Sequence, residues 1–343
     1  METTDPASDR RPRTTLAMSP QVVDQVFPPA VRARLDEVAD VRPGVLHEFD
    51  SPQARDALAG TEVLLTCWGC PAVDARVLDG APLLHAVVHA AGTVKPFVTE
   101  EVHARGIAVS TAADANAVPV AEFTLAAVIL GAKRAFPLSR RMGAERTGRA
   151  GLGALPPMGT NGLTVGVVGA SRVGRRVLRL LAACLDVRLL VHDPCLTDEE
   201  TRSLGAAPAG LDELLTLSDV VTVHAPELPG TRRLLDRKRL ALLRDGALLV
   251  NTARGRLVDT EALTEELLSG RIDAVLDVTD PEPLPPGSPL YDLPNVFLTP
   301  HLAGALGNEL PRLGGSAVQE IARLGRGEPL AFPVTAREWE YTA

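Results

Sequence analysis

The chain has 343 residues, of which 45% are hydrophobic and 23% are charged, and its formal net charge is −8. This length suits two domains with ordinary cores, and the composition is not that of a disordered chain. The negative charge argues against a nucleic-acid partner. No run approaches about eighteen consecutive apolar residues, so we expect no membrane span.

Short β-rich runs alternate with helical patterns, which predicts parallel sheets covered by helices. Residues 1–13 hold charges and prolines but no apolar signal core, so we expect a short disordered leader there. A long apolar helix is predicted from about Val118 to Ala135, long enough to cross a domain boundary. In the first third we expect strands at 14–19, 62–67, 83–91 and 107–111, with a helix at 31–41.

Cys67 and Cys70 form a C-x-x-C at the end of the second expected strand. Such a pair can be redox-active. Because it follows an apolar run, we favour a strand end with two incidental thiols. A zinc site would need two more cysteines or histidines at matched spacing, and none is present, so no metal site is expected. A reducing cytoplasm fits this cysteine usage best.

The second half begins with a stretch rich in glycine and arginine, residues 139–162, which reads as loop and turn. It is followed by six expected strands, the number in a complete dinucleotide-binding sheet. After them the chain is expected to be helical again from Ala303 to about Arg326. The six strands are expected at 163–170, 187–193, 220–225, 247–253, 274–279 and 296–300.

The turn from Gly169 to Gly174 leaves the first of these strands and enters a helical pattern. In that setting a G-x-G-x-x-G binds a pyrophosphate through backbone N–H groups at the helix N-terminus. Ser171 stands at the middle glycine position, a departure from the motif. The next strand ends at Asp193, where an acidic side chain accepts hydrogen bonds from the adenosine ribose and repels a 2′-phosphate. The pattern favours NAD over NADP, and a cofactor-free α/β domain is the alternative.

Three residues at strand ends suit the reduction of a 2-oxo acid. Arg254 can grip a carboxylate with two parallel hydrogen bonds. His301 is of the residue type that exchanges protons near neutrality. Glu282 can hold the imidazole and favour its protonated form. Each has an ordinary structural explanation when taken singly, and it is their arrangement in one half of the chain that suggests catalysis.

Several strings resemble the D-isomer-specific 2-hydroxyacid dehydrogenase family, whose signature blocks run in this order. The similarity covers nearly the whole chain after about residue 60. Its strongest part lies between residues 163 and 304. The strings are Asn116-Ala117-Val118-Pro119-Val120-Ala121-Glu122, the glycine turn, Ser218 to Pro226, Asn251-Thr252-Ala253-Arg254-Gly255, Asp277-Val278 with Pro281-Glu282-Pro283, and Thr299-Pro300-His301-Leu302-Ala303-Gly304.

The resemblance implies an α/β fold of two doubly wound parallel-sheet domains. A Rossmann NAD-binding domain, residues 116–304, would be inserted in a discontinuous, flavodoxin-like substrate-binding domain, residues 14–115 plus 305–343. It also implies a homodimer joined through the nucleotide domains, with the long helix among the contacts. The implied catalytic residues are Arg254, Glu282 and His301. The implied NAD contacts are Gly169, Ser171, Arg172, Val173, Gly174, Asp193, Pro226, Ala253, Asp277, His301 and Gly304.

The resemblance places a backbone loop of the first domain, Ala90 to Pro96, over the substrate carboxylate, with Gly92, Thr93, Lys95 and Arg254 as substrate-binding residues. Family members commonly carry an acidic or amide residue shortly after the glycine, whereas this chain has Val94 and Lys95. A lysine there could meet a second anionic group on the substrate. The alternative is a solvated loop cation that points away from the site.

Other functions remain open at this point. Some relatives of the family serve as NAD-sensing corepressor scaffolds, which a turnover assay would distinguish. Relatives that oxidise formate carry glutamine at the position of Glu282, so the glutamate argues against that activity. Relatives that oxidise phosphite keep all three catalytic residues, so phosphite or a phosphonate remains an alternative substrate. A cofactor-free binding module would leave NADH fluorescence unchanged on mixing.

Overall fold

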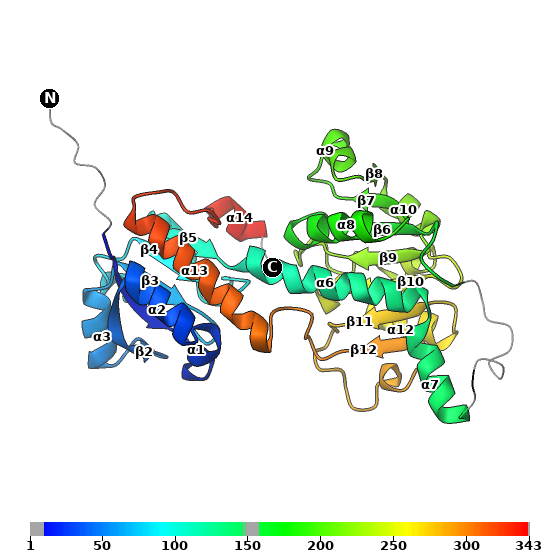
Figure 1. Ribbon diagram of the computed structural model, residues 1–343, viewed down its shortest axis with the longest axis horizontal. Helices are drawn as coiled ribbons and strands as arrows, with labels where there is room; N and C mark the ends of the chain where they lie inside the picture. The colour runs from blue at the N-terminus through cyan, green and yellow to red at the C-terminus, as the bar shows by residue number, and fades with distance from the viewer. Residues whose placement is uncertain (1–9, 147, 149–157, 342–343) are drawn as a thin grey trace. The chain divides into compact units, whose positions relative to one another are not determined.

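A computed structural model describes residues 10–146, 148 and 158–341 of the chain. The chain divides into two compact units, which we call unit 1 and unit 2 (Figure 1). Unit 1 comprises Met1–Asn116 and Ala305–Ala343, and unit 2 comprises Ala117–Gly304. Each unit contains one parallel β-sheet and its own core, so each is described by itself.

The sheet of unit 1 has the strand order β2-β1-β3-β4-β5, with every pair of strands parallel. This is the flavodoxin-like order, in which the chain winds outward from the first strand in both directions. The strands are β1 (Arg13–Ala17), β2 (Asp40–Leu46), β3 (Val63–Thr66), β4 (Ala86–His89) and β5 (Ala108–Thr111). The inner strands β3 and β4 are mostly apolar and fully buried, because helices and loops cover both faces of the sheet.

Two apolar clusters cover the faces of this sheet, and helices from both ends of the chain contribute to one of them. Helix α13 packs beside α1 and α2. Its Gly314 lies so close to the chain that a Cβ would stand 2.1 Å from the Val26 carbonyl oxygen. The helices of unit 1 are α1 (Pro20–Val26), α2 (Pro29–Val38), α3 (Pro52–Ala59), α4 (Ala75–Asp79), α5 (Glu100–Ala104), α13 (Leu310–Gly325) and α14 (Ala336–Tyr341).

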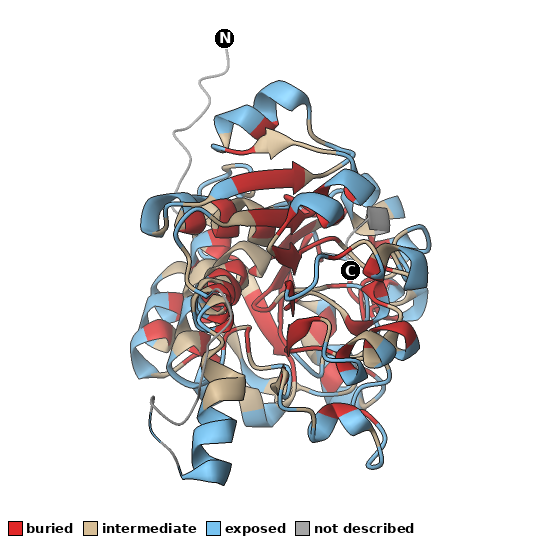
Figure 2. Ribbon diagram, turned by 90° about the vertical axis from the view of Figure 1, so that its right-hand side faces the viewer, coloured by how far each residue is buried: buried red, intermediate tan, exposed pale blue. Residues whose placement is uncertain are grey.

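The sheet of unit 2 has seven parallel strands in the order β12-β11-β10-β9-β6-β7-β8. From β8 this is the 3-2-1-4-5-6 order of a dinucleotide-binding sheet with one strand added. In Figure 2 the strands are largely buried and the outer helices carry exposed faces. The strands are β6 (Thr164–Val168), β7 (Arg188–His192), β8 (Ala207–Pro208), β9 (Val220–Val223), β10 (Leu248–Asn251), β11 (Asp273–Leu276) and β12 (Val296–Leu298).

The predicted fold class, two parallel sheets with helices, is therefore confirmed. The helices of unit 2 surround its sheet, and short 3₁₀ turns lie at Gly255–Leu257 (η2) and Pro289–Tyr291 (η3). These helices are α6 (Ala113–Ala132, which begins in unit 1), α7 (Ala135–Glu145), α8 (Arg172–Cys184), α9 (Asp198–Ser203), α10 (Leu211–Leu217), α11 (Arg237–Leu240) and α12 (Thr260–Leu268).

Some element boundaries differ from those expected. The helix predicted at 31–41 ends at Val38, and Asp40 and Val41 belong to β2, an unexpected strand that contains Pro43 and Gly44. β2 lies at the edge of its sheet, where proline is tolerated. Strand β8 is a further unexpected strand, and its two residues are too few to give a sequence pattern.

The long helix also differs from its prediction. It begins at Ala113 and ends at Ala132, and a separate helix α7 continues to Glu145, inside the stretch expected to be loop. Residues 147 and 149–157 of that stretch lie outside the described residues. Residues 10–13, expected to belong to a disordered leader, are ordered, because Arg11 donates hydrogen bonds to the Ala39 carbonyl and β1 begins at Arg13. Residues 1–9 lie outside the described part.

Helix α6 is long and apolar enough to cross a membrane by length and composition, with a hydropathy of 1.6. Ala121, Ala127 and Val128 belong to the core cluster that also contains Val165 and Val167 of β6. The core helix of a soluble protein gives the same signal, so this helix is weak evidence for a membrane span.

Candidate active site

The glycine turn of unit 2 is packed too tightly for side chains at two positions. Gly169 has φ +90°, and a Cβ there would lie 2.6 Å from the backbone nitrogen of Ala225. A Cβ on Gly174 would lie 2.1 Å from the carbonyl oxygen of Gly169. These two glycines bring the first turn of α8 close to the end of β6, as a phosphate-binding turn requires.

Ser171 is the N-cap residue of α8, and its side chain accepts no hydrogen bond from the helix. Its Oγ lies 3.5 Å from the carbonyl oxygen of His224. The side chain therefore does not cover the N-terminal N–H groups, which can bind an anion together with the helix dipole. Arg172 and Val173 follow in the first turn and are half-buried. This geometry fits a pyrophosphate despite the missing middle glycine.

Asp193 follows β7 and is tied to the same turn. Its Oδ2 accepts a hydrogen bond from the Ala170 N–H at 2.7 Å, and its Oδ1 accepts one from the Cys195 N–H at 2.8 Å. A carboxylate has about four acceptor sites, so acceptor capacity remains for ribose hydroxyls. The Ala170 carbonyl oxygen accepts a hydrogen bond from Arg175 Nε at 3.0 Å, which holds the turn from its other side.

Pro226 lies in the loop after β9 and is half-buried. Its carbonyl oxygen accepts a hydrogen bond from Thr231 Oγ1 at 2.6 Å, and the same hydroxyl accepts one from the Leu228 N–H at 2.8 Å. Thr231, which the sequence did not single out, therefore closes this loop. The β9 loop meets the glycine turn at Ala225, where Gly169 makes its closest approach.

Arg254 follows β10, and the turn that presents it is held by Asn251. The buried Asn251 side chain donates to the Arg254 carbonyl oxygen at 3.0 Å and accepts from the Ala253 N–H at 3.1 Å. The Arg254 guanidinium donates to the Ala253 carbonyl oxygen at 2.7 Å. Ala253 and Arg254 are both half-buried.

Gly255 joins the Arg254 turn to the loop that carries Glu282. A Cβ on Gly255 would stand 2.0 Å from the carbonyl carbon and oxygen of Thr279. Only glycine therefore allows the turn after β10 and the loop after β11 to approach this closely.

The loop from Thr299 to Ala303, after β12, is built around the carboxylate of Asp277. This carboxylate is almost fully buried. It accepts hydrogen bonds from Thr299 Oγ1 at 2.6 Å, from the Leu302 N–H at 2.8 Å and from the Ala303 N–H at 3.0 Å. His301 donates its backbone N–H to the Asp277 carbonyl oxygen at 2.9 Å. Asp277, expected as a cofactor contact, is in this structure the anchor of the His301 loop.

His301 has φ +54°, a left-handed conformation that is uncommon for a residue other than glycine. Its Nδ1 lies 2.8 Å from Oε1 of Glu282. Because a carboxylate oxygen can only accept, Nδ1 carries the hydrogen of this bond and Nε2 is the nitrogen left to exchange a proton. Both side chains remain nearly half exposed, at 48% and 45%.

The three candidate catalytic residues thus follow three neighbouring strands, Arg254 after β10, Glu282 after β11 and His301 after β12. Parallel strands end at one edge of a sheet, so these loops share that edge with the glycine turn. Gly304 is half-buried and is the last residue of unit 2. The next residue, Ala305, belongs to unit 1 and donates its N–H to Asn116 Oδ1 at 2.8 Å.

In unit 1 the expected substrate loop follows β4. Thr111 Oγ1 donates hydrogen bonds to the carbonyl oxygens of Ala91 and Gly92. Thr93 Oγ1 accepts one from the Lys95 N–H at 3.3 Å. Lys95 is exposed, and its Nζ lies 4.8 Å from the ring centroid of Trp339. The side chain is therefore placed against the C-terminal segment.

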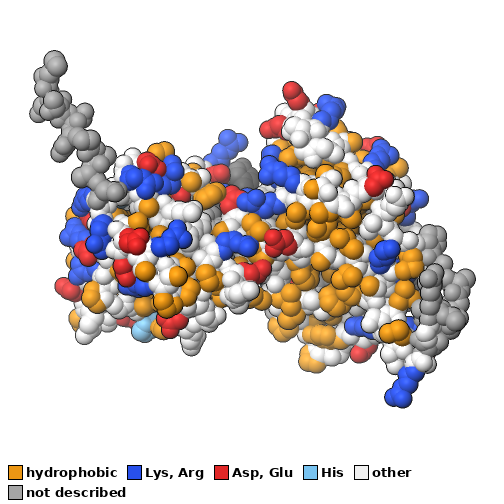
Figure 3. Space-filling view, in the orientation of Figure 1, with side chains coloured by type: hydrophobic (Ala, Val, Ile, Leu, Met, Phe, Trp, Pro, Cys, Tyr) orange, Lys and Arg blue, Asp and Glu red, His pale blue; other side chains and the backbone are white. Residues whose placement is uncertain are grey.

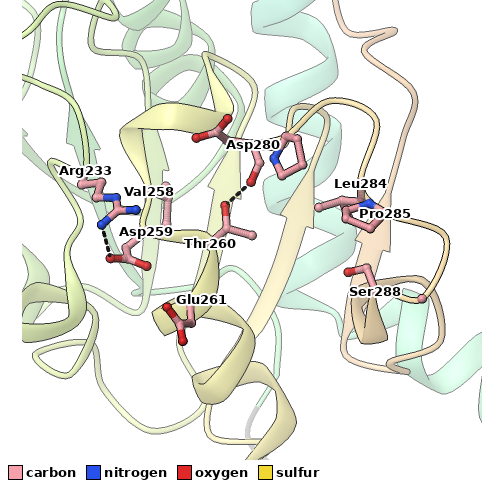
Figure 4. A pocket seen from close by; sticks show the side chains of 11 residues that line it. Arg233, Val258, Asp259, Thr260, Glu261, Asp280, Leu284, Pro285 and Ser288 are labelled. Carbon is pink, nitrogen blue, oxygen red and sulfur yellow. Dashed lines mark hydrogen bonds and ion pairs between the residues drawn. The ribbon is translucent and has the colours of Figure 1, made fainter.

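One cavity of about 590 Å³ lies behind the loop that carries Glu282, in unit 2. Figure 4 shows Asp259, Thr260 and Glu261 on one side and Leu284, Pro285 and Ser288 on the other. Its charged lining residues are Asp259, Glu261, Asp280 and Arg233, and Arg233 is 3.6 Å from Asp259. Three carboxylates beside one guanidinium would repel a pyrophosphate, so this cavity does not suit that part of the cofactor.

The C-x-x-C thiols show no sign of activation. Burial raises the pKa of Cys67 to about 12. The pKa of Cys70 is raised as well, mainly by burial. Reactive cysteines have a lowered pKa, so both thiols behave as packing residues.

These features define a dinucleotide-binding α/β domain with a hydrogen-bonded histidine–glutamate pair and an arginine at the same sheet edge. Residues 125–303 match the family model described as D-isomer specific 2-hydroxyacid dehydrogenase, NAD binding domain. The chain belongs to this family, as its sequence motifs predicted, and the cofactor that the family implies is NAD(H).

Relatives with assigned names agree with this placement. The chain is 33% identical over 316 residues to a glyoxylate reductase of Thermofilum pendens, with 89% of this chain and 91% of that protein aligned. It is 34% identical over 308 residues to a D-3-phosphoglycerate dehydrogenase of Mycobacterium bovis, which aligns 88% of this chain but 56% of that protein. The chain therefore spans about half the length of the phosphoglycerate dehydrogenases that it matches.

Among solved structures, a phosphoglycerate oxidoreductase from Rhizobium etli has a TM-score of 0.77 to this chain at 26% identity. The match covers 94% of this chain and 97% of that one, so the resemblance in fold extends over both units.

Proposed function

We propose that the chain is an NAD-dependent dehydrogenase that transfers a hydride between NAD(H) and a small 2-hydroxy or 2-oxo acid. The observation that carries this proposal is the 2.8 Å hydrogen bond between His301 Nδ1 and Glu282. His301 follows β12 and Glu282 follows β11, and Arg254 follows β10, the strand beside β11. Unit 1 would bind the substrate and unit 2 the cofactor. NADH, when bound, supplies the hydride.

The chain's own residues would hold the substrate and move the proton. The Arg254 guanidinium binds the substrate carboxylate with two parallel hydrogen bonds and polarises the neighbouring ketone. Glu282 fixes the imidazole of His301 so that Nε2 points away from it, and Nε2 donates a proton to the ketone oxygen as the alcohol forms. In the reverse direction Nε2 takes the proton from the hydroxyl group.

The cofactor would be held by the residues around the glycine turn. Gly169, Ser171, Arg172, Val173 and Gly174 would contact the pyrophosphate, and Asp193 the adenosine ribose. Two observations support this fit. A side chain at Gly169 or Gly174 would clash with nearby backbone atoms, and the N-terminus of α8 has no side-chain cap. We further propose that Pro226, Ala253, Asp277, His301 and Gly304 lie at the nicotinamide side.

Asp193 would also set the preference for NAD over NADP. The experiment compares kcat/KM with NADH and NADPH in wild type and Asp193→Ala. The wild-type kcat/KM should be higher with NADH than with NADPH. Asp193→Ala should bring the two kcat/KM values closer together, because a carboxylate that repels the 2′-phosphate of NADPH is lost. Equal or better kcat/KM with NADPH in wild type would refute this assignment.

On the substrate side, Gly92, Thr93 and Lys95 would assist Arg254. A panel assay of NADH oxidation with glyoxylate, hydroxypyruvate, pyruvate, branched 2-oxo acids and phosphonopyruvate, and of NAD reduction with phosphite, tests the substrate class. The names of the relatives, glyoxylate reductase and D-3-phosphoglycerate dehydrogenase, are the reason to test glyoxylate and the doubly anionic phosphonopyruvate first in this panel. No turnover with any of them would reject the proposed activity.

We also propose that the protein is a cytoplasmic homodimer joined through unit 2. Apolar side chains gather over the face of unit 2 along which α6 runs (Figure 3). Leu130 of α6 is 43% exposed and Met142 of α7 is 53% exposed, and no residue of α7 is buried. Light scattering after gel filtration should give twice the chain mass, and Leu130→Glu with Met142→Glu should give a monomer.

A further inference from the structure

Three neighbouring loops of unit 2, at the edge of the sheet where the proposed site lies, are joined by one guanidinium group. Glu227 lies in the loop after β9, Arg256 in the 3₁₀ turn η2 after β10, and Asp280 in the loop after β11. These strands are neighbours in the sheet, with β10 in the middle (Figure 1). Arg256 therefore lies on the central loop, from which its side chain reaches both others.

The side chain of Arg256 contacts a carboxylate on each of these two loops. Its Nη1 donates a hydrogen bond to Glu227 Oε1 at 3.2 Å, and its Nε lies 3.5 Å from Asp280 Oδ1. The hydrogen bond and the charge of Glu227, together with the charge of Asp280, raise the pKa of the guanidinium above its ordinary value. We call these three residues the Arg256 cluster. Without the guanidinium, the cluster would consist of two carboxylates close enough to repel each other.

The backbone of Arg256 is held in place, so the point from which its side chain extends is fixed. Its carbonyl oxygen accepts a hydrogen bond from the Arg233 N–H at 2.8 Å, and the Leu257 carbonyl oxygen accepts one from the Leu235 N–H at 3.0 Å. These two bonds tie the far end of the loop after β9 to η2. Glu227 lies at the near end of the same loop, and its ion pair with Arg256 ties that end to η2 as well.

The loop after β11 is joined to the same region by its backbone. The Asp280 carbonyl oxygen accepts a hydrogen bond from Thr260 Oγ1 at 2.7 Å, which Figure 4 shows. The Asp280 backbone nitrogen lies 2.6 Å from the position that a Cβ on Gly255 would take. The Asp280 carboxylate is therefore presented to Arg256 from a fixed backbone.

Each member of the Arg256 cluster lies one or two residues along the chain from a residue of the proposed site. These neighbours of Glu227, Arg256 and Asp280 are, in that order, Pro226, Arg254 and Glu282. A shift of any of the three loops would move the site residue that the loop carries. A displacement of about 1 Å is enough to slow catalysis by a large factor.

We propose that Arg256 is a positioning residue that sets the spacing of the loops after β9, β10 and β11, and with it the distance of Arg254 from Glu282. This inference rests on the function proposed above. The guanidinium attracts the carboxylates of both neighbouring loops and offsets the repulsion between them. Because the Arg256 side chain is 54% exposed, the cluster contributes little to the free energy of unfolding and acts on the geometry of the loops.

The first experiment measures kcat at saturating NADH and a saturating concentration of the best 2-oxo acid of the panel. Arg256→Met should lower kcat roughly threefold to tenfold, with little change in melting temperature. Arg256→Lys keeps the charge but not the planar fork, and it should give an intermediate kcat. Glu227→Gln, added to Arg256→Met, should raise kcat again, because the repulsion between the two carboxylates is relieved.

Arg237→Met is the matched control. It removes an ion pair of the same kind, between the exposed side chains of Arg237 and Glu265 in the same unit, and should leave kcat unchanged. Salt separates an electrostatic role of Arg256 from a role of its shape, because the Debye length is only about 3 Å at 1 M ionic strength. Between about 0.05 and 1 M NaCl, the wild-type kcat should fall toward that of Arg256→Met, whose own kcat should not fall.

Three results would each overturn the proposal. The first is a wild-type kcat in folded Arg256→Met. The second is a failure of Glu227→Gln to raise kcat in the Arg256→Met background. The third is a salt dependence of kcat that is the same in wild type and Arg256→Met, because the guanidinium would then not act through its charge.

A second experiment does not require turnover. Amide hydrogen exchange, followed by mass spectrometry, should be faster in Arg256→Met than in wild type for peptides covering residues 226–235 and 279–284. Exchange of both peptides should be unchanged in Arg237→Met. If no 2-oxo acid is turned over, the proposed activity fails, and this measurement still decides whether Arg256 holds the three loops together. Equal exchange in Arg256→Met and wild type would show that it does not.

Discussion

In the proposed mechanism Glu282 acts only through its hydrogen bond to His301, and this arrangement has a kinetic consequence. The carboxylate accepts the Nδ1 hydrogen at 2.8 Å and so holds the ring with Nε2 available. We expect His301→Ala to lower kcat by roughly 10²- to 10⁴-fold, because general acid catalysis is lost. Glu282→Gln should lower kcat less, since an amide can still accept this hydrogen bond but does not stabilise a positive imidazole.

The double variant tests whether the two residues act as one unit. Steady-state kinetics of the His301→Ala, Glu282→Gln protein should give a kcat no lower than that of His301→Ala alone, because Glu282 then has nothing to orient. Arg254→Ala is the comparison, and its effect should persist in the His301→Ala background. If the effects of His301→Ala and Glu282→Gln on kcat multiplied in the double variant, Glu282 would have a role independent of the histidine.

Gly255 is a second residue-scale determinant, because it lets the loops of two proposed catalytic residues, Arg254 and Glu282, approach each other closely. Gly255→Ala places a Cβ 2.0 Å from the Thr279 carbonyl, which must force the turn of Arg254 away from the loop of Glu282. We expect a loss of stability of about 1–3 kcal/mol and a fall in kcat/KM, measured by urea unfolding and by the turnover assay. Gly287→Ala, where nothing lies within 4 Å, is the matched control in the same region. Wild-type kcat/KM in Gly255→Ala would show that the contact between the loops is dispensable.

The sequence could predict that Arg254, Glu282 and His301 follow neighbouring strands, because each comes after an apolar run; their catalytic roles stay predictions. It could not reveal the side chains that hold them. Asn251 and Asp277 act through hydrogen bonds to backbone atoms of loops whose paths are unknown before folding. Their single sequence-level signal is a polar residue directly at the end of a buried strand, which is also found at structural positions.

At the scale of elements, the close packing of α8 on β6 determines how the glycine turn presents its N–H groups. Gly174→Ala would place a methyl group 2.1 Å from the Gly169 carbonyl oxygen. The helix must then move outward, and we expect the Kd for NADH to rise roughly tenfold or more, measured by fluorescence titration. Gly210→Ala, at the start of α10 with open space around it, should leave the Kd unchanged. An unchanged Kd in Gly174→Ala would argue against the turn as the pyrophosphate site.

The elements differ in how well the sequence indicated them. Buried strands such as β6, β9 and β10 are continuous apolar runs with turn residues after them, so both their type and place were evident. Strand β2 was missed because Pro43 and Gly44 are typical of a turn, and only pairing with β1 makes this segment a strand. Helix α7 has no buried residues, so its sequence lacks the apolar periodicity of a packed helix.

At the scale of the whole molecule, each unit contains one histidine enclosed in its core. His89 in unit 1 bonds to Thr66 Oγ1 through Nδ1, and His224 in unit 2 bonds to Thr222 Oγ1 through Nε2, each at 2.9 Å. Burial lowers the pKa of both imidazoles to about 3, from an ordinary value of 6.5. Folding therefore holds both rings neutral at a pH where the unfolded chain would protonate them.

The sign of the pH effect follows from this difference. Between pH 6.5 and about 3 the unfolded chain binds more protons than the folded one, so the free energy of unfolding falls as the pH falls. Each histidine should contribute about 1.4 kcal/mol per pH unit to this slope. His89→Asn and His224→Gln keep an amide in place of the bonded ring nitrogen and remove the titration, so each variant should have a shallower slope by that amount.

Urea unfolding at pH values between about 4.5 and 7.5 checks this prediction, because linear extrapolation of each transition to zero denaturant gives the free energy of unfolding at that pH. Carboxylates also titrate at the lower end, but their contribution is common to wild type and variants and cancels in the difference. If the two units unfold separately, His89→Asn should alter one transition and His224→Gln the other. Parallel pH dependences in wild type and both variants would contradict the proposed origin of the acid sensitivity, because two buried neutral imidazoles must make acid unfolding easier.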